Sequence, residues 1–212
     1  RTDRRSDILI TSCDGIGKSG TQYARMYAKI NSISSSCIVD SNSLIKKISS
    51  INTETSVPKA IVLVDDVVGS GETLSEGIEC LLNTIGKYLQ DLNIPLLVIA
   101  IIGTEEGEEK VNNILKRHSE INKIYVSEML ENTSIAFPKE GFGFWEDLDE
   151  MHRAKSLALK LGTKIYKKPL GFNEQGLLLV LPETCPNNSL PILFQSKAGK
   201  EPWKPLFERP TS

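Results

Sequence analysis

The run Ile61–Val64 places four apolar residues in a row and is followed directly by two carboxylates, Asp65 and Asp66. An uninterrupted apolar run of this length is typical of a strand buried on both faces, as in the interior of a parallel sheet. Two more apolar residues lead to a short turn that contains Gly69 and Gly71. The stretch therefore predicts a buried strand whose end carries two acids and a glycine turn.

The glycine turn precedes an amphipathic helix. A turn at a helix N-terminus presents backbone N–H groups, and its glycines let a ligand approach the chain closely. The hydroxyls of Ser70 and Thr73 add further donors. We therefore expect the residues from Gly69 to Thr73 to bind a phosphate group. The predicted helix carries its apolar residues on one face: Leu74, Ile78, Leu81, Leu82, Ile85 and Leu89.

The two acids before the turn suit a different part of the same ligand. Asp65 and Asp66 can accept hydrogen bonds from sugar hydroxyls or organise a Mg²⁺ shell. A phosphate site and a diol site one turn apart fit a ribose 5-phosphate. The alternative is an ordinary βα connection, in which the carboxylates are solvated or cap the helix.

The complete run from Ile61 to Leu74 resembles the signature of type I phosphoribosyltransferases that binds phosphoribosyl pyrophosphate (PRPP). The resemblance implies that Asp65 and Asp66 hold the ribose 2- and 3-hydroxyls, as catalytic residues and as carboxylates for Mg²⁺, the implied cofactor. It implies that the following loop holds the 5-phosphate. The substrate-binding residues implied there are Val68, Gly69, Ser70, Gly71, Glu72 and Thr73.

A second unit of strand, glycine loop and helix opens the chain. The strand is expected at Ile8–Ile10, and Lys18 in the loop places a cation where a polyphosphate would lie. In type I phosphoribosyltransferases an early loop embraces the pyrophosphate. The resemblance implies this role for Asp14, Gly15, Gly17, Lys18, Ser19 and Gly20. The helix after the loop is predicted to place Tyr23, Met26, Tyr27 and Ile30 on one face.

The same loop supports a rival hypothesis. Gly17-Lys18-Ser19 ends the pattern of a P-loop, G-x-x-x-x-G-K-[ST], although Ser12 takes the place of the first glycine. A strand ending in two acids would then be a Walker B element of an NTPase. The missing glycine, and the lack of a role for the turn at Gly69–Thr73, favour the phosphoribosyl interpretation.

Strands and helices alternate through the first part of the chain, which predicts an α/β fold with a central parallel sheet flanked by helices. Ile61–Asp65 should be a central strand between the first strand and Pro95–Ile102. Ligands of such sheets bind at the carboxyl ends of the strands, where both glycine loops would lie. Other predicted strands are Cys37–Asp40 and Asn122–Ser127; predicted helices are Leu44–Ile48 and Glu105–His118, the latter with Val111, Ile114 and Leu115 inward.

The composition changes after Met129. We expect a single domain over residues 1–212, with a core at about 7–128 and an irregular C-terminal hood at about 129–212. The hood should contain a helix at Trp145–Leu161 with an acidic first turn and a basic later part, as the helix dipole favours. It should also contain a strand at Leu177–Leu181. A second substrate would enter under Phe142–Trp145 and the proline-rich loop Pro182–Ile192.

The combination D-G-x-G-K-S-G, V-D-D-V-V-G-S-G-E-T, G-F-G-F-W and P-N-N-S-L-P-I resembles the phosphoribosyltransferase-like domain of bacterial conflict systems, from Ile8 to Phe207. These domains are effectors beside anti-phage modules, including some retrons. The resemblance implies a PRPP-type ligand and protein partners from a defence operon. The polar connection Ser49–Pro58 shows no match to the flexible catalytic loop of type I enzymes. A non-catalytic PRPP or nucleotide sensor therefore stays open beside a transferase.

Composition limits the kinds of ligand and the cellular compartment that the sequence predicts. The net charge of −2 argues against nucleic acid as the main ligand and leaves a local basic patch open. Apolar runs are too short for a membrane span, and no signal peptide opens the chain, so we expect a cytoplasmic protein. The four scattered cysteines fit neither a metal site nor a disulfide framework. Because the chain begins with Arg1 rather than methionine, we expect it to be a piece of a longer protein.

Overall fold

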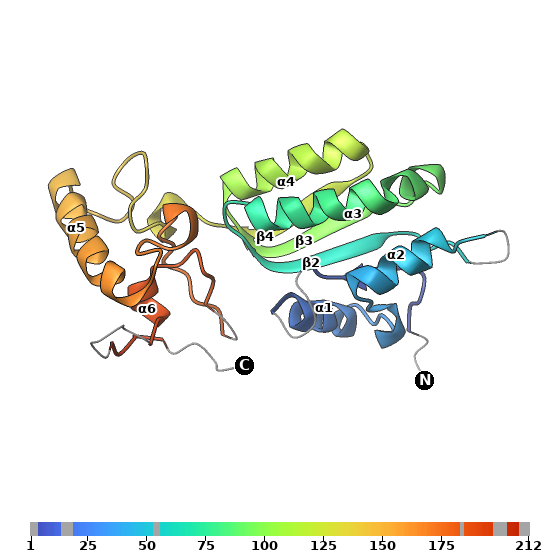
Figure 1. Ribbon diagram of the computed structural model, residues 1–212, viewed down its shortest axis with the longest axis horizontal. Coiled ribbons are helices and arrows are strands. Elements are labelled where there is room, and N and C mark those ends of the chain that lie inside the picture. The colour runs from blue at the N-terminus through green and yellow to red at the C-terminus, as the bar shows by residue number, and fades with distance from the viewer. Residues whose placement is uncertain (1–3, 14–18, 53–55, 183–184, 197–202, 208–212) are drawn as a thin grey trace. The chain divides into compact units, whose positions relative to one another are not determined.

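The computed structural model describes residues 4–13, 19–52, 56–182, 185–196 and 203–207. The chain divides into two compact units, Arg1–Met129 and Leu130–Ser212. The first unit holds a four-stranded sheet in the order β1-β2-β3-β4, and every neighbouring pair is parallel. Helices cover this sheet (Figure 1), so the fold is α/β with a central parallel sheet, as predicted.

Strand β2 (Ile61–Val68) lies inside the sheet, between β1 (Leu9–Thr11) and β3 (Leu96–Gly103), while β4 (Lys123–Met129) pairs with the far side of β3. Alternate side chains of β2 enter different apolar clusters: Ile61 and Leu63 one of them, Val62 and Val64 the other. The strand is thus buried on both faces, which confirms the prediction. It continues to Val68, however, so the two acids lie within the strand and do not end it.

Three helices share one face of the sheet, namely α2 (Ser41–Ser49), α3 (Glu72–Asp91) and α4 (Glu105–His118). The whole predicted apolar face of α3 is buried there, as are the three inward residues predicted for α4. Helix α4 begins and ends at the predicted residues. Its N-cap is Thr104, and its acidic first turn and basic last turn both complement the helix dipole.

Helix α1 (Ser19–Ile30) packs on the opposite face (Figure 1). Its predicted inward face is partly wrong, because the side chains of Met26 and Ile30 are 46% and 77% exposed. The buried side instead combines Tyr23 with the small residues Ala24 and Ala28. Small side chains let the helix axis approach the sheet closely, which an apolar periodicity built on large residues does not reveal.

The predicted strand at Cys37–Asp40 is reduced to an isolated parallel bridge between Ile38 and Ile10. Local side-chain bonds form a 3₁₀ turn, η1 (Ser35–Cys37), whose N-cap Ser34 accepts a hydrogen bond from the backbone of Ser36. Asp40 caps α2 by accepting from the N–H of Ser43 at 3.0 Å. The pKa of Asp40 is held below its usual value mainly by the hydrogen bond from the Ser43 hydroxyl, with a second contribution from the Ser43 N–H. Polar residues that bond their own backbone compete with a strand.

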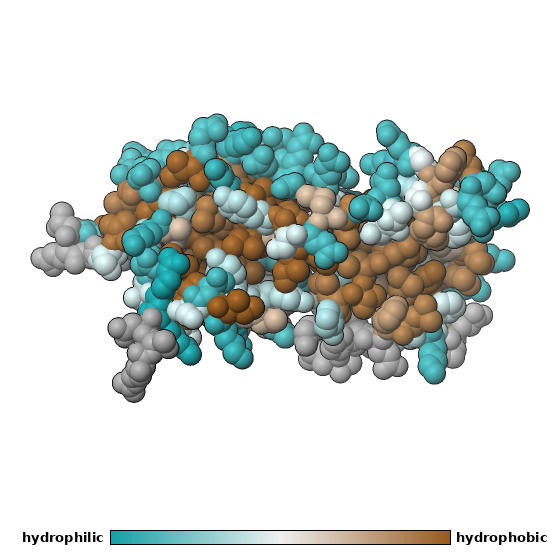
Figure 2. All heavy atoms as spheres, turned by 180° about the vertical axis from the view of Figure 1, so that it is seen from behind, coloured by the Kyte–Doolittle hydropathy of each residue, from teal (hydrophilic) through white to brown (hydrophobic). Residues whose placement is uncertain are grey.

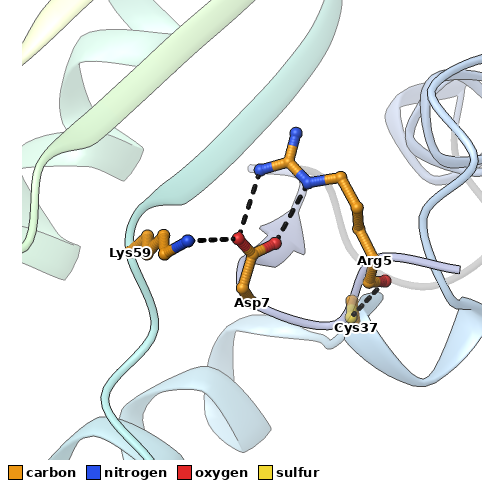
Figure 3. Close-up of polar contacts among 4 residues, drawn as sticks. All are labelled: Arg5, Asp7, Cys37 and Lys59. Atoms are coloured by element: carbon orange, nitrogen blue, oxygen red, sulfur yellow. Dashed lines mark hydrogen bonds and ion pairs between the residues drawn. The ribbon is translucent and has the colours of Figure 1, made fainter.

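A small charged cluster connects the residues just before β1 with the residues just before β2 (Figure 3). Arg5 Nε lies 3.1 Å from Asp7 Oδ1, and Lys59 Nζ lies 3.1 Å from Asp7 Oδ2. The Arg5 guanidinium first, and the Lys59 ammonium second, hold the pKa of Asp7 below its usual value. Because the pKa is lowered in the fold, this contribution to stability is present above the unfolded pKa and is lost as pH falls through the folded one.

The second unit contains α5 (Leu148–Ile165), α6 (Pro191–Phe194) and two 3₁₀ turns, η2 (Asn132–Ser134) and η3 (Phe172–Glu174). Helix α5 begins three residues later than predicted. Its N-cap is Asp147, whose carboxylate accepts from the N–H of Glu150 at 2.7 Å. Capping by an aspartate fixes the start of the helix more sharply than hydrophobic periodicity does. The core of this unit contains Ala136, Ala158, Leu170 and Leu190.

The predicted strand at Leu177–Leu181 does not form. Leu177 makes only isolated bridges, antiparallel to Ile135 and parallel to Ser189. The carbonyl of Leu179 accepts from the Ser189 hydroxyl at 2.6 Å, so a side chain replaces a ladder partner. The uninterrupted apolar run Leu177–Leu181 predicted a strand, but a local run cannot supply neighbouring strands.

Both tryptophans of the second unit make hydrogen bonds. The indole of Trp145 donates to the carbonyl of Ala136 and stacks on Phe137 at a centroid distance of 6.1 Å. The indole of Trp203 donates to the carbonyl of Ile192 at 3.0 Å. These bonds give the two side chains a structural role within the unit.

Within the described ranges, no helix is both long and apolar enough to cross a membrane. Apolar residues nevertheless reach the surface in the view of Figure 2. On the α1 side of the sheet, β3 and β4 present half-buried or exposed apolar residues: Leu97, Ile99, Ile101, Tyr125 and Met129.

Substitution of two glycines within helices by alanine should change the stability of the fold in opposite directions. A methyl group at Gly86 in α3 would meet His118 Nδ1 at 3.6 Å, an ordinary contact, whereas one at Gly162 in α5 would meet the carbonyl oxygen of Pro169 at 2.6 Å. We expect Gly86→Ala to raise the free energy of unfolding by about 0.5–1 kcal/mol through helix propensity. Gly162→Ala should lower it by about 1–3 kcal/mol through overpacking.

Urea unfolding followed by far-UV circular dichroism measures both changes. Tryptophan fluorescence reports on the second unit alone, because the chain's two tryptophans, Trp145 and Trp203, lie there. A stabilising Gly162→Ala variant would contradict the described approach of α5 to Pro169.

Candidate functional site

The predicted phosphate turn connects β2 to α3. Val68, Gly69, Ser70 and Gly71 are buried, Glu72 is half-buried and Thr73 is exposed. Gly71 is the N-cap of α3 with φ +69°, a left-handed conformation that favours glycine, and it offers no capping side chain. The first N–H groups of a helix lack partners within the helix. This geometry therefore directs backbone donors toward a ligand at the start of α3.

Thr104, at the end of β3, braces the turn. Its hydroxyl donates to the carbonyl oxygen of Gly69 at 2.6 Å, and its N–H donates to that of Val68 at 2.9 Å. The same hydroxyl accepts from the N–H of Gly107 at 3.1 Å, which caps α4. One buried side chain thus fixes the peptide groups of the turn and the start of the next helix together.

The turn also touches α4 directly. A Cβ atom at Gly107 would lie 2.2 Å from the carbonyl oxygen of Gly69, a separation that no side chain tolerates. A Cβ atom at Gly71 would lie 2.8 Å from the carbonyl oxygen of Gly107. Both glycines are therefore required by the close approach of the two backbones. Gly71 thus has a packing role that the sequence did not reveal.

Two side chains of the turn have partners of their own. The carboxylate of Glu72 lies 3.7 Å from the ammonium of Lys110 in α4, and both groups are partly exposed. The hydroxyl of Ser70 accepts from the N–H of Glu72 at 3.5 Å. Glu72 therefore links α3 to α4, in addition to the phosphate-binding role that the resemblance implies.

The two acids are half-buried in β2. One oxygen of Asp65 accepts from the N–H of Asp66, and one oxygen of Asp66 accepts from the N–H of Val67, each at 2.9 Å. A carboxylate has about four lone-pair positions, which is more than these backbone bonds use.

Mg²⁺ is typically bound by one or two carboxylates together with substrate oxygens and water. Consecutive side chains of a strand point to opposite faces of the sheet, so Asp65 and Asp66 do not share one face within β2. Within the described part of the chain, no three His, Cys, Asp or Glu side chains gather into a metal site. Either carboxylate alone can supply one ligand to a cation that arrives with a phosphorylated substrate.

The early glycine loop falls largely outside the described residues, which exclude Asp14, Gly15, Gly17 and Lys18. Ser19 begins α1, and Gly20 is buried against β2, where an added Cβ would lie 3.5 Å from the carbonyl oxygen of Val64. On the other side of the loop, the thiol of Cys13 would lie 3.0 Å from a Cβ at Gly77 in α3. The ends of this loop thus flank β2 and α3, the two elements that the phosphate turn joins.

The sequence missed the contribution of α4. No role was predicted for Thr104 or Gly107, because their contacts with Gly69 span 35 residues of sequence or more. A glycine in the first turn of a helix, where it lowers helix propensity, was the signal available in the sequence.

A parallel sheet whose inner strand carries two acids and leads through a glycine turn into a helix defines a type I phosphoribosyltransferase-like domain. The chain belongs to the PRTase-CE family, whose model matches residues 1–209. This match confirms the resemblance to phosphoribosyltransferases. None of the curated proteins matches the chain.

Two solved structures show limited similarity. Orotate phosphoribosyltransferase from Aeropyrum pernix is 17% identical with a TM-score of 0.32, and the match covers 59% of this chain and 62% of that one. ATP citrate lyase from Methanothrix soehngenii, in complex with citrate and coenzyme A, is 11% identical with a TM-score of 0.37, over 73% of this chain and 39% of that one. The chain thus spans less than two thirds of the length of either structure.

Thr104→Val tests the brace of the turn. The substitution keeps the shape but leaves a buried carbonyl at Gly69 and a buried N–H at Gly107 without their partner, at a cost of roughly 1–3 kcal/mol in the free energy of unfolding. Thr104→Ser, which keeps the hydroxyl, should recover most of this loss. Urea unfolding followed by circular dichroism gives both values. Equal stability of the valine and serine variants would contradict the role of the hydroxyl.

Proposed function

We propose that this chain binds PRPP and transfers, or responds to, its phosphoribosyl group. The proposal is carried by one observation: a half-buried acid pair lies in the strand that leads into a braced glycine turn at a helix N-terminus. Membership of the PRTase-CE family supports it. The 5-phosphate would accept hydrogen bonds from the backbone of residues 69–73, and the ribose 2- and 3-hydroxyls would donate to Asp65 and Asp66.

In transfer, the C1–O bond of PRPP would break, leaving positive charge on the ribose and negative charge on pyrophosphate. Lys18 and the backbone donors between Asp14 and Gly20 would stabilise the leaving group where its charge develops. Asp65 and Asp66 would hold the ribose and place negative charge near the electron-poor ring. Bound Mg²⁺ would neutralise phosphate charge. The second substrate would be a nucleophile, such as a base, that bonds to C1 as pyrophosphate leaves.

The biological setting is a further part of the proposal. The resemblance to domains of bacterial conflict systems supports an anti-phage effector whose protein partners come from a defence operon. A sensor that binds PRPP without turnover is the second candidate function. It is favoured by the polar connection before β2, which lacks a recognisable catalytic-loop motif. Release of pyrophosphate from PRPP identifies a transferase, and saturable binding without release identifies a sensor.

The acid pair gives the decisive test. The double variant Asp65→Asn, Asp66→Asn should lose PRPP binding in a calorimetric titration with Mg²⁺ and keep its fold by circular dichroism. Each charge-assisted hydrogen bond to a ribose hydroxyl contributes roughly 1.5–3 kcal/mol, so the affinity should fall at least a hundredfold. Unchanged affinity would mean that the acids are structural.

A second pair of variants separates the two phosphate loops and the NTPase alternative. Thr73→Val removes an exposed hydroxyl without touching the α4 contact, unlike any substitution at Gly71. It should weaken ribose 5-phosphate and PRPP alike by about three- to tenfold, the value of one hydrogen bond. Lys18→Ala should weaken PRPP and spare ribose 5-phosphate, because only PRPP carries a pyrophosphate.

The wild type and both variants are titrated with ribose 5-phosphate, PRPP and ATP, and their affinities are compared. Tight ATP binding that depends on Lys18 and ignores Thr73 would favour a P-loop enzyme and contradict the phosphoribosyl assignment.

A further inference from the structure

Helix α5 and the residues after it carry a concentration of positive charge that the proposed site does not use. Between Met151 and Lys168 the chain has no acidic residue, although the net charge of the whole chain is −2. The preceding residues, Glu146 to Glu150, are by contrast mostly acidic. Six cationic residues fall within the basic segment: Arg153, Lys155, Lys160, Lys164, Lys167 and Lys168.

Three of the four cationic residues within α5 lie on one side of the helix, and Lys155 lies on the other. Arg153, Lys160 and Lys164 follow a spacing of seven and four residues, which places them on one face. The buried face of α5 is formed by Met151, Ala158, Gly162 and Ile165, and lies opposite. All three cationic residues are exposed, as is Lys167 beyond the helix. We call Arg153, Lys160 and Lys164, together with the exposed Lys167 that follows the helix, the basic face of α5.

Helix stability accounts for only part of this charge: Asp149 and Glu150 precede Arg153 by four and three residues, a spacing that favours an acid–base pair. The helix dipole favours cations only within the last turn, which includes Lys164 but not Arg153 or Lys160. Within the described part of the chain, Arg153, Lys160 and Lys167 make no ion pair. Lys168, by contrast, has a structural contact, with its ammonium 3.7 Å from the centroid of the Phe172 ring.

The length of the basic face indicates a polymeric anion. An α-helix rises 1.5 Å per residue, so Arg153 to Lys164 extend over about 16 Å, the axial length of about five nucleotides of one DNA strand. A single small anion cannot contact cations over this distance. The buried apolar residues of α5 pack within its own unit, and the exposed Leu148, Leu157 and Leu159 do not share one face, so the helix offers no continuous apolar face to a lipid surface.

We propose that the basic face of α5 binds the phosphate backbone of a nucleic acid. The net charge of the chain argued against nucleic acid as a main ligand, but the charge that matters is local and is segregated onto one helix face. Contacts with phosphates carry no base information, so binding is sequence-independent and strongly dependent on salt. This inference stands independently of the proposed phosphoribosyl site, which lies in the other unit.

Fluorescence anisotropy of the whole chain with labelled 30-nucleotide RNA and DNA, single- and double-stranded, tests the proposal between 50 and 200 mM salt. The triple variant Arg153→Gln, Lys160→Gln, Lys167→Gln should bind about ten- to thirtyfold more weakly than the wild type at 100 mM salt. The slope of log K against log salt should fall by about 2–3, because each lost phosphate contact removes about 0.7–0.9.

A matched control removes the same charge elsewhere. Lys46, Lys47 and Lys116 lie on exposed positions of α2 and α4 in the first unit and make no described ion pair. Their triple replacement by glutamine should leave the affinity and the salt slope within twofold of the wild type. Circular dichroism and melting temperature confirm that both triple variants are folded.

Four outcomes would overturn the proposal. They are no oligonucleotide binding by the wild type at 50 mM salt, wild-type affinity in the α5 variant, equal loss in the α5 variant and the control, or binding to poly-glutamate or anionic vesicles without binding to any oligonucleotide. Restoration of the affinity by Arg153→Lys, Lys160→Arg, Lys167→Arg, which keeps the charge, would support it.

Discussion

The contact between the glycine turn after β2 and the first turn of α4 is the constraint on which the candidate site depends. The backbone of Gly107 approaches the carbonyl of Gly69 so closely that no larger residue fits at position 107 unless the backbone shifts. Thr104 completes this contact with hydrogen bonds to the carbonyls of both Val68 and Gly69. Peptide groups with fixed carbonyls have fixed N–H directions as well, so the turn is preorganised before any ligand arrives.

Preorganisation matters because a phosphate-binding loop gains little from donors that must first be ordered. The two acids are likewise held in place. Each has one oxygen bound by the N–H of the next residue, and the strand that carries them is buried up to Val64. The first unit thus supplies two rigid supports, a strand for the two acids and a helix pair for the glycine turn.

Much of the first unit could be predicted because its signals are local. The run Ile61–Val64 and the apolar face of α3 each require burial on known sides, and the structure confirms both. One failed prediction has a local cause, since Asp40 caps α2 instead of joining a strand. The other does not, because Leu177 in the second unit finds only isolated partners from elsewhere in the chain. The brace at Thr104 could not be predicted, because a hydrogen bond to Gly69 across 35 residues leaves no periodic pattern.

A crystal structure of the chain with ribose 5-phosphate and Mg²⁺ tests the central claim most directly. The account predicts phosphate oxygens within hydrogen-bond distance of backbone N–H groups between Gly69 and Thr73, with the ribose hydroxyls facing Asp65 and Asp66. A phosphate bound instead against Lys18 alone, with the turn after β2 free of ligand, would contradict it.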